Sequence, residues 1–339
     1  MSMVNVLAGD VGGTNTRLGL FEKTSSRPRS LAVREFATLD FPDLPAMIAA
    51  FLRAEGQGDA KVESACFGVA GPVLGDVAQL TNTPWRVDAN AVARGLTLPS
   101  SRVRLLNDLE AMAYSVPVLR DDEVHVLQAG RPAKDGADSA GSVDHGGHIA
   151  VIAAGTGLGE AFLQRVNGRF VALASEAGHA DYAARTEPDI TLLRDLVARF
   201  GRAQVEHVVS GRGLLNIHRV THTDACAAGI DRDDPDAPAA ISTAALNGRC
   251  PGCAEALSIF VDAYGAEAGN LALRTMSTAG VFVGGGIAPK ILPALTTGVF
   301  MRAFRAKAPF EALLDAVPVK VILHSTPGLL GAANFCSHT

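Results

Sequence analysis

The chain has 339 residues, 48% of them hydrophobic and 19% charged, so it is long enough for about two domains and apolar enough to bury large cores. This composition excludes a disordered protein, which combines low hydrophobicity with high charge. The formal net charge of −5 excludes a strongly basic surface, so nucleic acid is not an expected partner.

The N-terminus lacks the basic segment of a signal peptide, and Asp10 interrupts its apolar run. The uncharged stretch 276–289 is rich in glycine and shorter than the ~20 residues that span a bilayer. The chain has 5 cysteines, an odd number, which do not make a disulfide framework in a protein of this size. We therefore expect a cytoplasmic protein with reduced thiols and no membrane partner.

The first third of the chain alternates strands with helices. Apolar runs at 4–8 and 17–21 flank a glycine-rich segment, which predicts a β-hairpin with positive φ angles at Gly12 and Gly13. Asn107-Asp108 precedes an apolar helical run, so one of the two is the expected N-cap. The other elements expected here are strands over 33–38, 62–70 and 103–106 and a helix over 44–54. This order predicts an α/β domain.

The strand pattern restarts in the second half of the chain. Apolar runs at 148–154 and 160–163 flank Gly155-Thr156-Gly157, so a hairpin with a Gly-Thr turn occurs twice. Such a duplication would place two backbone-amide turns across a cleft from each other. The remaining elements expected are exposed loops over 131–147 and 229–238, helices over 189–200, 205–220, 254–275 and 327–335, and strands over 280–283 and 319–323.

The segment Gly9-Asp-Val-Gly-Gly-Thr14 is the strongest local chemical signal. Backbone N–H groups of such a turn converge on an anion, and a threonine hydroxyl adds a donor. Asp10 fits beside a phosphate if Mg²⁺ lies between them, although an ordinary hairpin turn with a solvated aspartate explains the motif equally well. The sequence contains neither a P-loop motif nor a Gly-x-Gly-x-x-Gly that opens a helix, which argues against both of those nucleotide-binding folds.

Polar residues elsewhere carry weaker signals. A carboxylate at Asp108 could accept a proton from a substrate hydroxyl, or Asn107-Asp108 could serve only as a helix cap. Glu176-Ala-Gly-His179 places a carboxylate and an imidazole in one turn, which suits the binding of vicinal hydroxyls. Glu206 could add a third polar contact, or be a solvated helix residue.

Two further motifs indicate metal or redox chemistry only faintly. Cys250-x-x-Cys253 has the spacing of a redox pair or half a zinc site, but no second such pair accompanies it, so we expect a structural or incidental role. His218 and His222 share a helix face without acidic or cysteine ligands beside them in the pattern. We therefore expect them to be surface histidines.

Seven segments along nearly the whole chain carry a resemblance to a known family. They are GDVGGTNTRLGLF (9–21), LNDLEAMA (106–113), AAGTGLGEAFL (153–163), SEAGHADYA (175–183), VEHVVSGRGLLNIHR (205–219), GVFVGGGIAPK (280–290) and PGLLGAANF (327–335). Each motif is loose, but in this order and spacing the set resembles the bacterial glucokinases, in the hexokinase branch of the actin-like ATPase superfamily.

The resemblance implies an α/β, two-domain actin-like ATPase (ribonuclease H-like) fold with a central interdomain cleft. The implied domains are a small one over 1–118 plus 324–339 and a large one over 119–323. The implied activity is ATP-dependent phosphorylation of D-glucose at its 6-hydroxyl, the first step of glycolysis. ATP and Mg²⁺ are the implied cofactors, glucose is the substrate, and the assembly is a homodimer.

The resemblance also assigns roles to single residues. Asp108 is implied to be the catalytic base, and Asp10 to approach Mg²⁺ through water, so that no side chain is a direct metal ligand. The residues implied to bind glucose are Asn107, Asp108, Glu176, His179 and Glu206. The residues implied to bind ATP are Gly9, Asp10, Val11, Gly12, Gly13 and Thr14 in a first turn, Gly155, Thr156 and Gly157 in a second, and Gly285 and Gly286 on the adenosine side.

The chain departs from the family pattern at two places. Ala177 replaces the first of two glycines between the sugar-binding glutamate and histidine, which we expect to adjust the sugar pocket slightly. The segment 131–147 is long for the family. The clustered Cys/His zinc motif of the related repressor–kinase branch is absent from the sequence, which argues against a DNA-bound regulator. The alternatives are a fructose or mannose kinase, a non-catalytic sugar sensor and an actin-like filament protein, the last of which would not need the polar turn 176–179.

Overall fold

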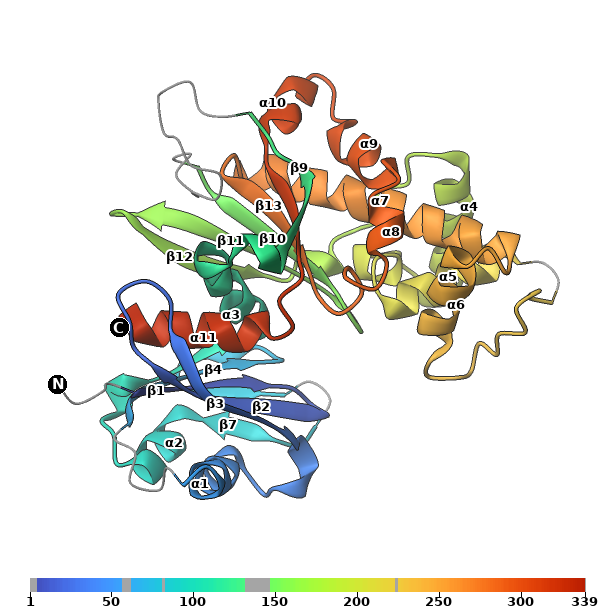
Figure 1. Ribbon diagram of the computed structural model, residues 1–339. Helices are drawn as coiled ribbons and strands as arrows, with labels where there is room; N and C mark the ends of the chain where they lie inside the picture. The colour runs from blue at the N-terminus through green and yellow to red at the C-terminus, as the bar shows by residue number, and fades with distance from the viewer. Residues whose placement is uncertain (1–4, 57–61, 81–82, 132–146, 223–224, 339) are drawn as a thin grey trace. The chain divides into compact units, whose positions relative to one another are not determined.

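The computed structural model describes residues 5–56, 62–80, 83–131, 147–222 and 225–338 (Figure 1). The chain divides into two compact units. Unit 1 comprises residues 1–120, 166–174 and 324–339, and unit 2 comprises residues 121–165 and 175–323. The loop predicted over 131–147 falls on residues 132–146, which lie outside the described residues.

Unit 1 is built on a five-stranded sheet in the order β3-β2-β1-β4-β8. Its strands are β1 (Asn5–Val11), β2 (Asn15–Glu22), β3 (Arg29–Ala37), β4 (Val62–Val69) and β8 (Val103–Asn107). The first three strands are antiparallel, whereas β1, β4 and β8 are mutually parallel neighbours. Parallel strands need cover on both faces, and β4 is accordingly apolar and buried over most of its length.

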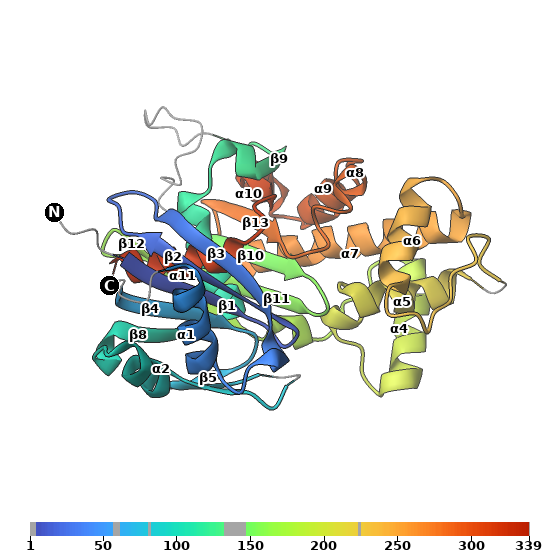
Figure 2. The same ribbon diagram turned by 60° about the horizontal axis from the view of Figure 1, so that its bottom comes forward.

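Helices cover both faces of this sheet (Figures 1 and 2). Side chains alternate along β1, so that Leu7 belongs to one apolar cluster and Val6 and Ala8 to another. The first cluster includes residues of α1 (Leu44–Ala54) and α2 (Ala89–Leu96). The second includes residues of α3 (Asp108–Ser115) and α11 (Pro327–His338). A small sheet of β5 (Val73–Leu74), β6 (Val77–Gln79) and β7 (Arg86–Asp88) completes unit 1.

A six-stranded sheet, in the order β12-β11-β10-β13-β14-β9, is built mainly from unit 2. Its strands are β9 (Val124–Gln128), β10 (Ile149–Ala154), β11 (Leu158–Val166), β12 (Arg169–Ser175), β13 (Gly280–Gly284) and β14 (Val319–Ile322). The helices of unit 2 are α4 (Glu187–Phe200), α5 (Gly211–Thr221), α6 (Ala237–Leu246), α7 (Pro251–Thr275), α8 (Leu292–Leu295), α9 (Val299–Arg305) and α10 (Glu311–Ala316).

Helix α7 is the centre of the unit 2 core. The buried hydroxyl of Tyr264 accepts from the Ala154 N–H at 3.2 Å and donates to the Gly284 carbonyl at 3.2 Å, which ties α7 to β10 and β13. Gly265 lets α9 approach closely, because a Cβ there would lie 2.2 Å from the Phe300 carbonyl oxygen. Although α7 has 25 residues, no helix within the described ranges combines the length and apolar character needed to cross a membrane.

The two sheets repeat one arrangement, as the duplicated sequence pattern predicts. The antiparallel pair β1–β2 is joined by residues 12–14 and the pair β10–β11 by residues 155–157. In each case the first strand has a parallel neighbour on its other side, β4 for β1 and β13 for β10. The prediction that the hairpin occurs twice is therefore confirmed.

Two local predictions are wrong. Gly12 and Gly13 do not take positive φ angles; a Cβ on Gly12 would instead lie 2.8 Å from the Asn15 carbonyl oxygen, so close backbone approach requires the glycine. The helix predicted over 205–220 begins only at Gly211, after the short 3-10 turn η6 (Val205–His207). Ser210 caps α5 by accepting from the Gly213 N–H at 2.9 Å, which fixes the start of the helix.

Candidate functional site

The carboxyl ends of the parallel strands of unit 1 lie at one edge of the sheet. Val11 is paired with Val69, and Val69 with Asn107, so β1, β4 and β8 end in register. The turn 12–14 and the start of α3 therefore share this edge, with only β4 between their strands, a lateral spacing of about 10 Å. Ligands of open α/β sheets bind outside this edge, where strands give way to loops and helices.

The turn 12–14 is held from the side by Thr38. The fully buried Thr38 hydroxyl donates to the Gly12 carbonyl at 2.8 Å, and the Thr38 N–H donates to the Thr14 carbonyl at 2.8 Å. These bonds use backbone carbonyls and leave the Thr14 side chain exposed. Thr38 was not among the predicted site residues, because its contact with Gly12 joins positions 26 residues apart.

Asp10 lies at the end of β1, opposite Arg17 on β2. Burial raises the pKa of the Asp10 carboxyl, Arg17 lowers it, and Glu35 raises it further. The first turn of α11 also approaches Asp10, since a Cβ on Gly328 would lie 3.3 Å from its Cγ. The amino end of α11 and Arg17 thus favour an ionised Asp10, against the cost of burial.

Asp108 is the first residue of α3 and is positioned by a capping box. The Asn107 side chain accepts from the Leu109 N–H at 2.8 Å, and the Glu110 carboxylate accepts from the Asn107 N–H at 2.9 Å. This confirms the prediction of an N-cap at Asn107 or Asp108 and assigns it to Asn107. Asp108 Oδ1 accepts from the Leu109 N–H at 2.9 Å, so its carboxylate is held at the sheet edge and half-buried.

The second Gly-Thr turn, in unit 2, is closed by backbone bonds. Gly155 N–H donates to the Gly157 carbonyl at 2.8 Å, and Gly211 N–H donates to the Gly155 carbonyl at 2.8 Å, which joins the turn to the start of α5. Glu206 Oε2 accepts from the Leu158 N–H at 2.8 Å. A Cβ on Gly157 would lie 2.4 Å from Glu206 Oε2, so a side chain at this position would displace the carboxylate.

The polar turn at 176–179 packs against Leu158, the first residue of β11. A Cβ on Gly178 would lie 2.2 Å from the Leu158 carbonyl oxygen, so the second glycine position of the motif is fixed by packing. The His179 Nδ1 lies 2.8 Å from Gln204 Oε1, and its Nε2 lies 4.0 Å from Glu176 Oε2. The Glu176 and His179 side chains are exposed by 75% and 51%, so both can reach a ligand.

Unit 2 therefore gathers Glu176, His179 and Glu206 around the turn 155–157. Gln204, which orients the His179 ring, was not among the predicted residues. An amide among turn residues carries no signal in the sequence, and the bridge between Asp181 and Gln204 that places it pairs distant segments.

Gly285 follows β13 and lies against the end of β10. Its φ of 82° is in the left-handed region, and a Cβ would lie 2.3 Å from the Ala154 carbonyl oxygen, so glycine is required on both grounds. The Ile287 N–H donates to the same carbonyl at 3.2 Å. A cavity of about 430 Å³ next to these turns is lined by Gly155, Thr156, Gly211, Ile287 and Lys290, among others.

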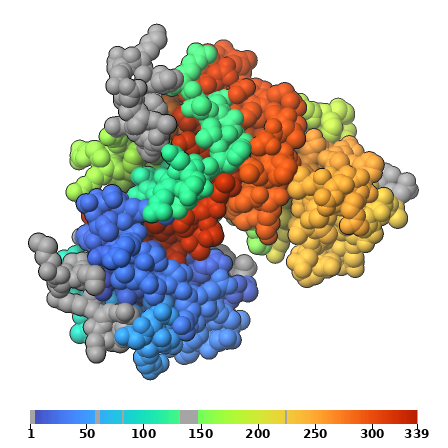
Figure 3. Space-filling view, in the orientation of Figure 1, coloured from blue at the N-terminus to red at the C-terminus, as the bar shows by residue number. Residues whose placement is uncertain are grey.

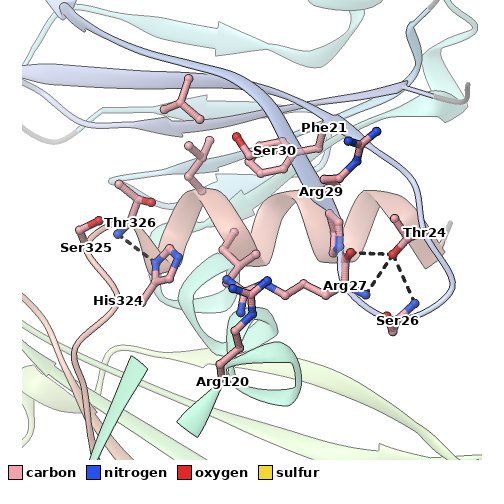
Figure 4. Close-up of a pocket in the computed structure, with 14 residues that line it drawn as sticks. Phe21, Thr24, Ser26, Arg27, Arg29, Ser30, Arg120, His324, Ser325 and Thr326 are labelled. Atoms are coloured by element: carbon pink, nitrogen blue, oxygen red, sulfur yellow. Dashed lines mark hydrogen bonds between the residues drawn. The ribbon is translucent and has the colours of Figure 1, made fainter. Parts of the chain in front are cut away.

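A larger cavity, of about 670 Å³, lies in unit 1 away from the candidate site (Figure 4). Arg27, Arg29 and Arg120 line it, together with His324 and Thr326 before α11. Its loop wall is ordered by Thr24, whose hydroxyl donates to the Arg27 carbonyl at 2.6 Å. None of the predicted site residues lines this cavity, so its greater size does not make it the candidate site.

The expectation that His218 and His222 are surface histidines is wrong. His218 is fully buried, and both rings lie beside Cys226 and Cys253. The sequence pattern did not show this proximity, because α5 packs against α7 and brings together residues that are remote in the chain.

Comparisons with known proteins identify the family of the chain. The family model for glucokinase matches residues 7–339. A glucokinase of Nostoc sp. is 37% identical over 350 residues, covering 98% of each chain. The crystal structure of a glucokinase from an Antarctic psychrotroph has a TM-score of 0.83 and 29% identity, covering 99% of each chain.

A ROK family glucokinase from Streptomyces griseus, solved with glucose and AMPPNP, has a TM-score of 0.63 and 22% identity, covering 99% of this chain and 100% of that chain. At this identity the likeness concerns the fold alone. The family model, by contrast, spans nearly the whole sequence, and the Nostoc relative is similar along its full length. The chain therefore belongs to the glucokinase family.

Proposed function

We propose that this protein transfers the terminal phosphoryl group of ATP to the 6-hydroxyl of D-glucose, giving glucose 6-phosphate and ADP. The observation that carries the proposal is the position of Asp108, a carboxylate held at the carboxyl edge of the unit 1 sheet, which it shares with the turn 12–14. Family membership supports the reaction, and the glucose and AMPPNP bound to the Streptomyces griseus protein support a sugar and an ATP-type nucleotide as ligands.

The proposed fold is that of a two-domain actin-like ATPase, related to ribonuclease H. The repeated hairpin with its parallel neighbouring strand, once in each unit, supports this assignment. The proposed domains, 1–118 plus 324–339 and 119–323, rest on the family resemblance. The compact units differ from them chiefly in that residues 166–174 belong to unit 1.

In the proposed reaction, Asp108 accepts the proton of the 6-hydroxyl while the hydroxyl oxygen forms a bond to the terminal phosphorus. The bond from phosphorus to the bridging oxygen of ATP breaks, and ADP leaves. Such a transfer depends mainly on positioning and on neutralising charge, so few protein groups need to react. Asn107, Glu176, His179 and Glu206 are proposed to hold the other hydroxyls of the sugar.

The nucleotide phosphates are proposed to lie against the segment 9–14, which comprises the end of β1 and the turn 12–14, and against the turn 155–157. Gly285 and Gly286 are proposed to border the adenosine, and the cavity beside Gly155 and Ile287 offers space for it. The closeness of Gly285 to the end of β10 supports the pairing of these two segments around one nucleotide.

Asp10 fits a nearby Mg²⁺ better than it fits a bare phosphate. Burial disfavours its ionised form, and a divalent cation would restore it. Mg²⁺ retains most of its water, so we propose that Asp10 acts on it through water while the phosphates bind the ion directly. When bound, the ion neutralises phosphate charge.

We also propose that the enzyme works in the cytoplasm as a homodimer. None of the 5 cysteines, all of which lie in the described ranges, is part of a disulfide, which suits a reducing compartment. The homodimer rests on the family resemblance.

The Asp108→Asn variant tests the proposal. The amide keeps the shape of the side chain but cannot accept the proton, so we expect kcat to fall by about 10²- to 10⁴-fold with little change in glucose binding. The measurement is ADP release coupled to a spectrophotometric assay, with glucose affinity from calorimetry. Asp88→Asn is the matched control, since Asp88 caps α2 and asparagine caps equally well. Near-normal turnover in Asp108→Asn would remove this residue from the mechanism.

The same assay across glucose, fructose and mannose tests the sugar. We expect the highest kcat/KM with glucose. A clear preference for another hexose would reassign the substrate, and sugar binding without ADP release would identify a sensor.

A further inference from the structure

A cluster of thiols and imidazoles lies in unit 2 between α5 and the start of α7. His218 is on α5, His222 is its C-cap and Cys226 follows shortly after; Cys250 is the N-cap of α7, and Cys253 lies in the first turn of that helix. Cys250 and Cys253 are both buried, and Cys226 is partly so. Figure 3 shows the residues from about 225 to 250, drawn in gold, at the surface of the molecule. None of these residues has a role in the proposed phosphoryl transfer.

The separations between the sulfur atoms are those of a metal site. Cys226 Sγ lies 3.8 Å from Cys250 Sγ and 3.7 Å from Cys253 Sγ. A disulfide would need about 2.0 Å. Sulfurs bound to one tetrahedral zinc at about 2.3 Å are separated by about 3.8 Å. The thiols are thus spaced as ligands around a common centre.

His222 presents its other ring nitrogen to this group. The His222 Nδ1 lies 3.0 Å from the carbonyl oxygen of His218 and therefore carries the proton that it donates. Its Nε2 consequently has a lone pair, and it lies 3.2 Å from Cys250 Sγ. A metal-bound histidine almost always donates its second N–H to a carbonyl or carboxylate in this way.

His218 is arranged differently. Arg232 Nε donates to the His218 Nδ1 at 3.1 Å, so the proton of the neutral ring resides on Nε2. This Nε2 is buried and has no hydrogen-bond partner within the described ranges, and His218 is fully buried. A ring nitrogen of His218 lies within 4.8 Å of the sulfurs of Cys226 and Cys253. The Nε2–H can therefore donate to a thiolate, and the positively charged Arg232 lies at the opposite nitrogen of the His218 ring.

We propose that His222, Cys226, Cys250 and Cys253 bind a structural Zn²⁺ ion. Three thiolates and one imidazole form a complete tetrahedral set, which leaves no open position for catalysis and is typical of structural zinc. His218 is proposed as a positioning residue that orients a thiolate. The ion would join α5 to α7, and α5 begins at Gly211, whose N–H holds the turn 155–157.

Metal analysis of the full-length protein tests this site. Protein purified without an affinity tag, reconstituted with zinc and then dialysed, is expected to retain about one zinc per chain. Replacing Cys226, Cys250, Cys253 or His222 with alanine should abolish this retention. Cys336→Ala, at a buried cysteine of unit 1, and His125→Ala are matched controls that should retain it. Absence of zinc from the reconstituted wild type, or its retention in the Cys226 variant, would overturn the proposal.

Cobalt substitution keeps the test decisive if a variant folds poorly. Wild-type protein loaded with Co²⁺ should show thiolate-to-cobalt charge transfer together with the visible bands of tetrahedral cobalt. The His218→Ala variant should keep these bands at saturating metal but bind zinc about 10- to 100-fold more weakly. This is the usual effect of losing a residue that hydrogen-bonds to a metal ligand. Octahedral cobalt spectra, or a Cys250–Cys253 disulfide in freshly purified protein, would contradict the assignment.

Discussion

Glu160 is a carboxylic acid in an environment that disfavours its charge. It lies in β11 with its side chain fully buried, and its two carboxylate oxygens have no hydrogen-bond partner among the described residues. Burial and the neighbouring Glu267 raise the pKa of Glu160 to about 8, against a lowering effect of Arg274. The neutral acid is thus the form that the folded protein holds at neutral pH.

We predict that Glu160→Gln removes a loss of stability at high pH. The pKa of Glu160 is higher in the folded than in the unfolded protein. The contribution of protonated Glu160 to the free energy of unfolding is therefore full below about pH 4.5 and is lost as the pH rises toward about 8. The neutral amide does not ionise. The free energy of unfolding of Glu160→Gln, relative to that of the wild type, should therefore grow by up to about 1.4 kcal/mol per pH unit in this window. Urea unfolding of both proteins at pH 5, 6, 7 and 8 measures this difference in the free energy of unfolding. A constant difference between the two across that range would show that Glu160 does not titrate as described.

Site residues differed in how well the sequence predicted them. A helix cap at Asn107 or Asp108 followed from local chemistry, since cap, carboxylate and helix are contiguous, and the structure assigns it to Asn107. Thr38 and the cluster around His222 could not be found in this way. Their contacts join residues 26 and 28 positions apart, and only the packing of the fold brings them together. Gly12 was expected to take a positive φ angle, whereas the close approach of the Asn15 carbonyl requires the glycine, and such an approach leaves no trace in the sequence.

At the level of elements, α3 shows how a short helix can position Asp108, the proposed catalytic base. Glu110 reaches back to the Asn107 N–H and closes the capping box, and Asp108 lies between them. Burial raises the pKa of Glu110, whereas the bond from the Asn107 N–H lowers it. The carboxylate of Glu110 therefore stabilises the turn in which Asp108 is placed.

Glu110→Ala is predicted to destabilise the start of α3 by about 1 kcal/mol, the usual cost of losing a cap. Because Asp108 would then be less well oriented, kcat should fall while KM for ATP changes little. Glu110→Gln is the matched control, since its amide oxygen can still accept from the Asn107 N–H. Thermal unfolding and steady-state kinetics on the three proteins measure both effects. Equal kcat in Glu110→Ala and the wild type would show that the capping box stabilises the helix but does not orient Asp108 for the reaction.

Elements with a strong local pattern were predicted best. The helix α1 begins and ends where its apolar spacing indicated, and Asp43 caps it by accepting from the Ala46 N–H. The start of α5 was misjudged, because the run 205–220 is continuously helix-compatible and the cap at Ser210 interrupts it. The partly exposed edge strand β3 begins at Arg29, four residues before the predicted start, since an edge strand does not need an apolar pattern.

At the level of the whole molecule, the proposed function assigns residues of both units to the same two ligands. Asp108 belongs to unit 1, whereas Glu176, His179 and Glu206 belong to unit 2. A ligand bound by one unit alone would stabilise that unit and leave the unfolding of the other unchanged. Ligand-dependent unfolding therefore distinguishes the proposed division of roles from a site confined to one unit.

We predict that glucose with a non-hydrolysable ATP analogue raises the thermal midpoints of both units. At one hundred times its Kd a ligand adds about 2.7 kcal/mol, equivalent to about 5 to 10 °C for a domain of 150 to 250 residues. Hydrogen exchange read separately for α3 in unit 1 and for α5 in unit 2 reports each unit. Protection that increases in both helices with both ligands is expected. Protection limited to α5 would place sugar and nucleotide on unit 2 alone, and Asp108 would then have no hydroxyl to deprotonate.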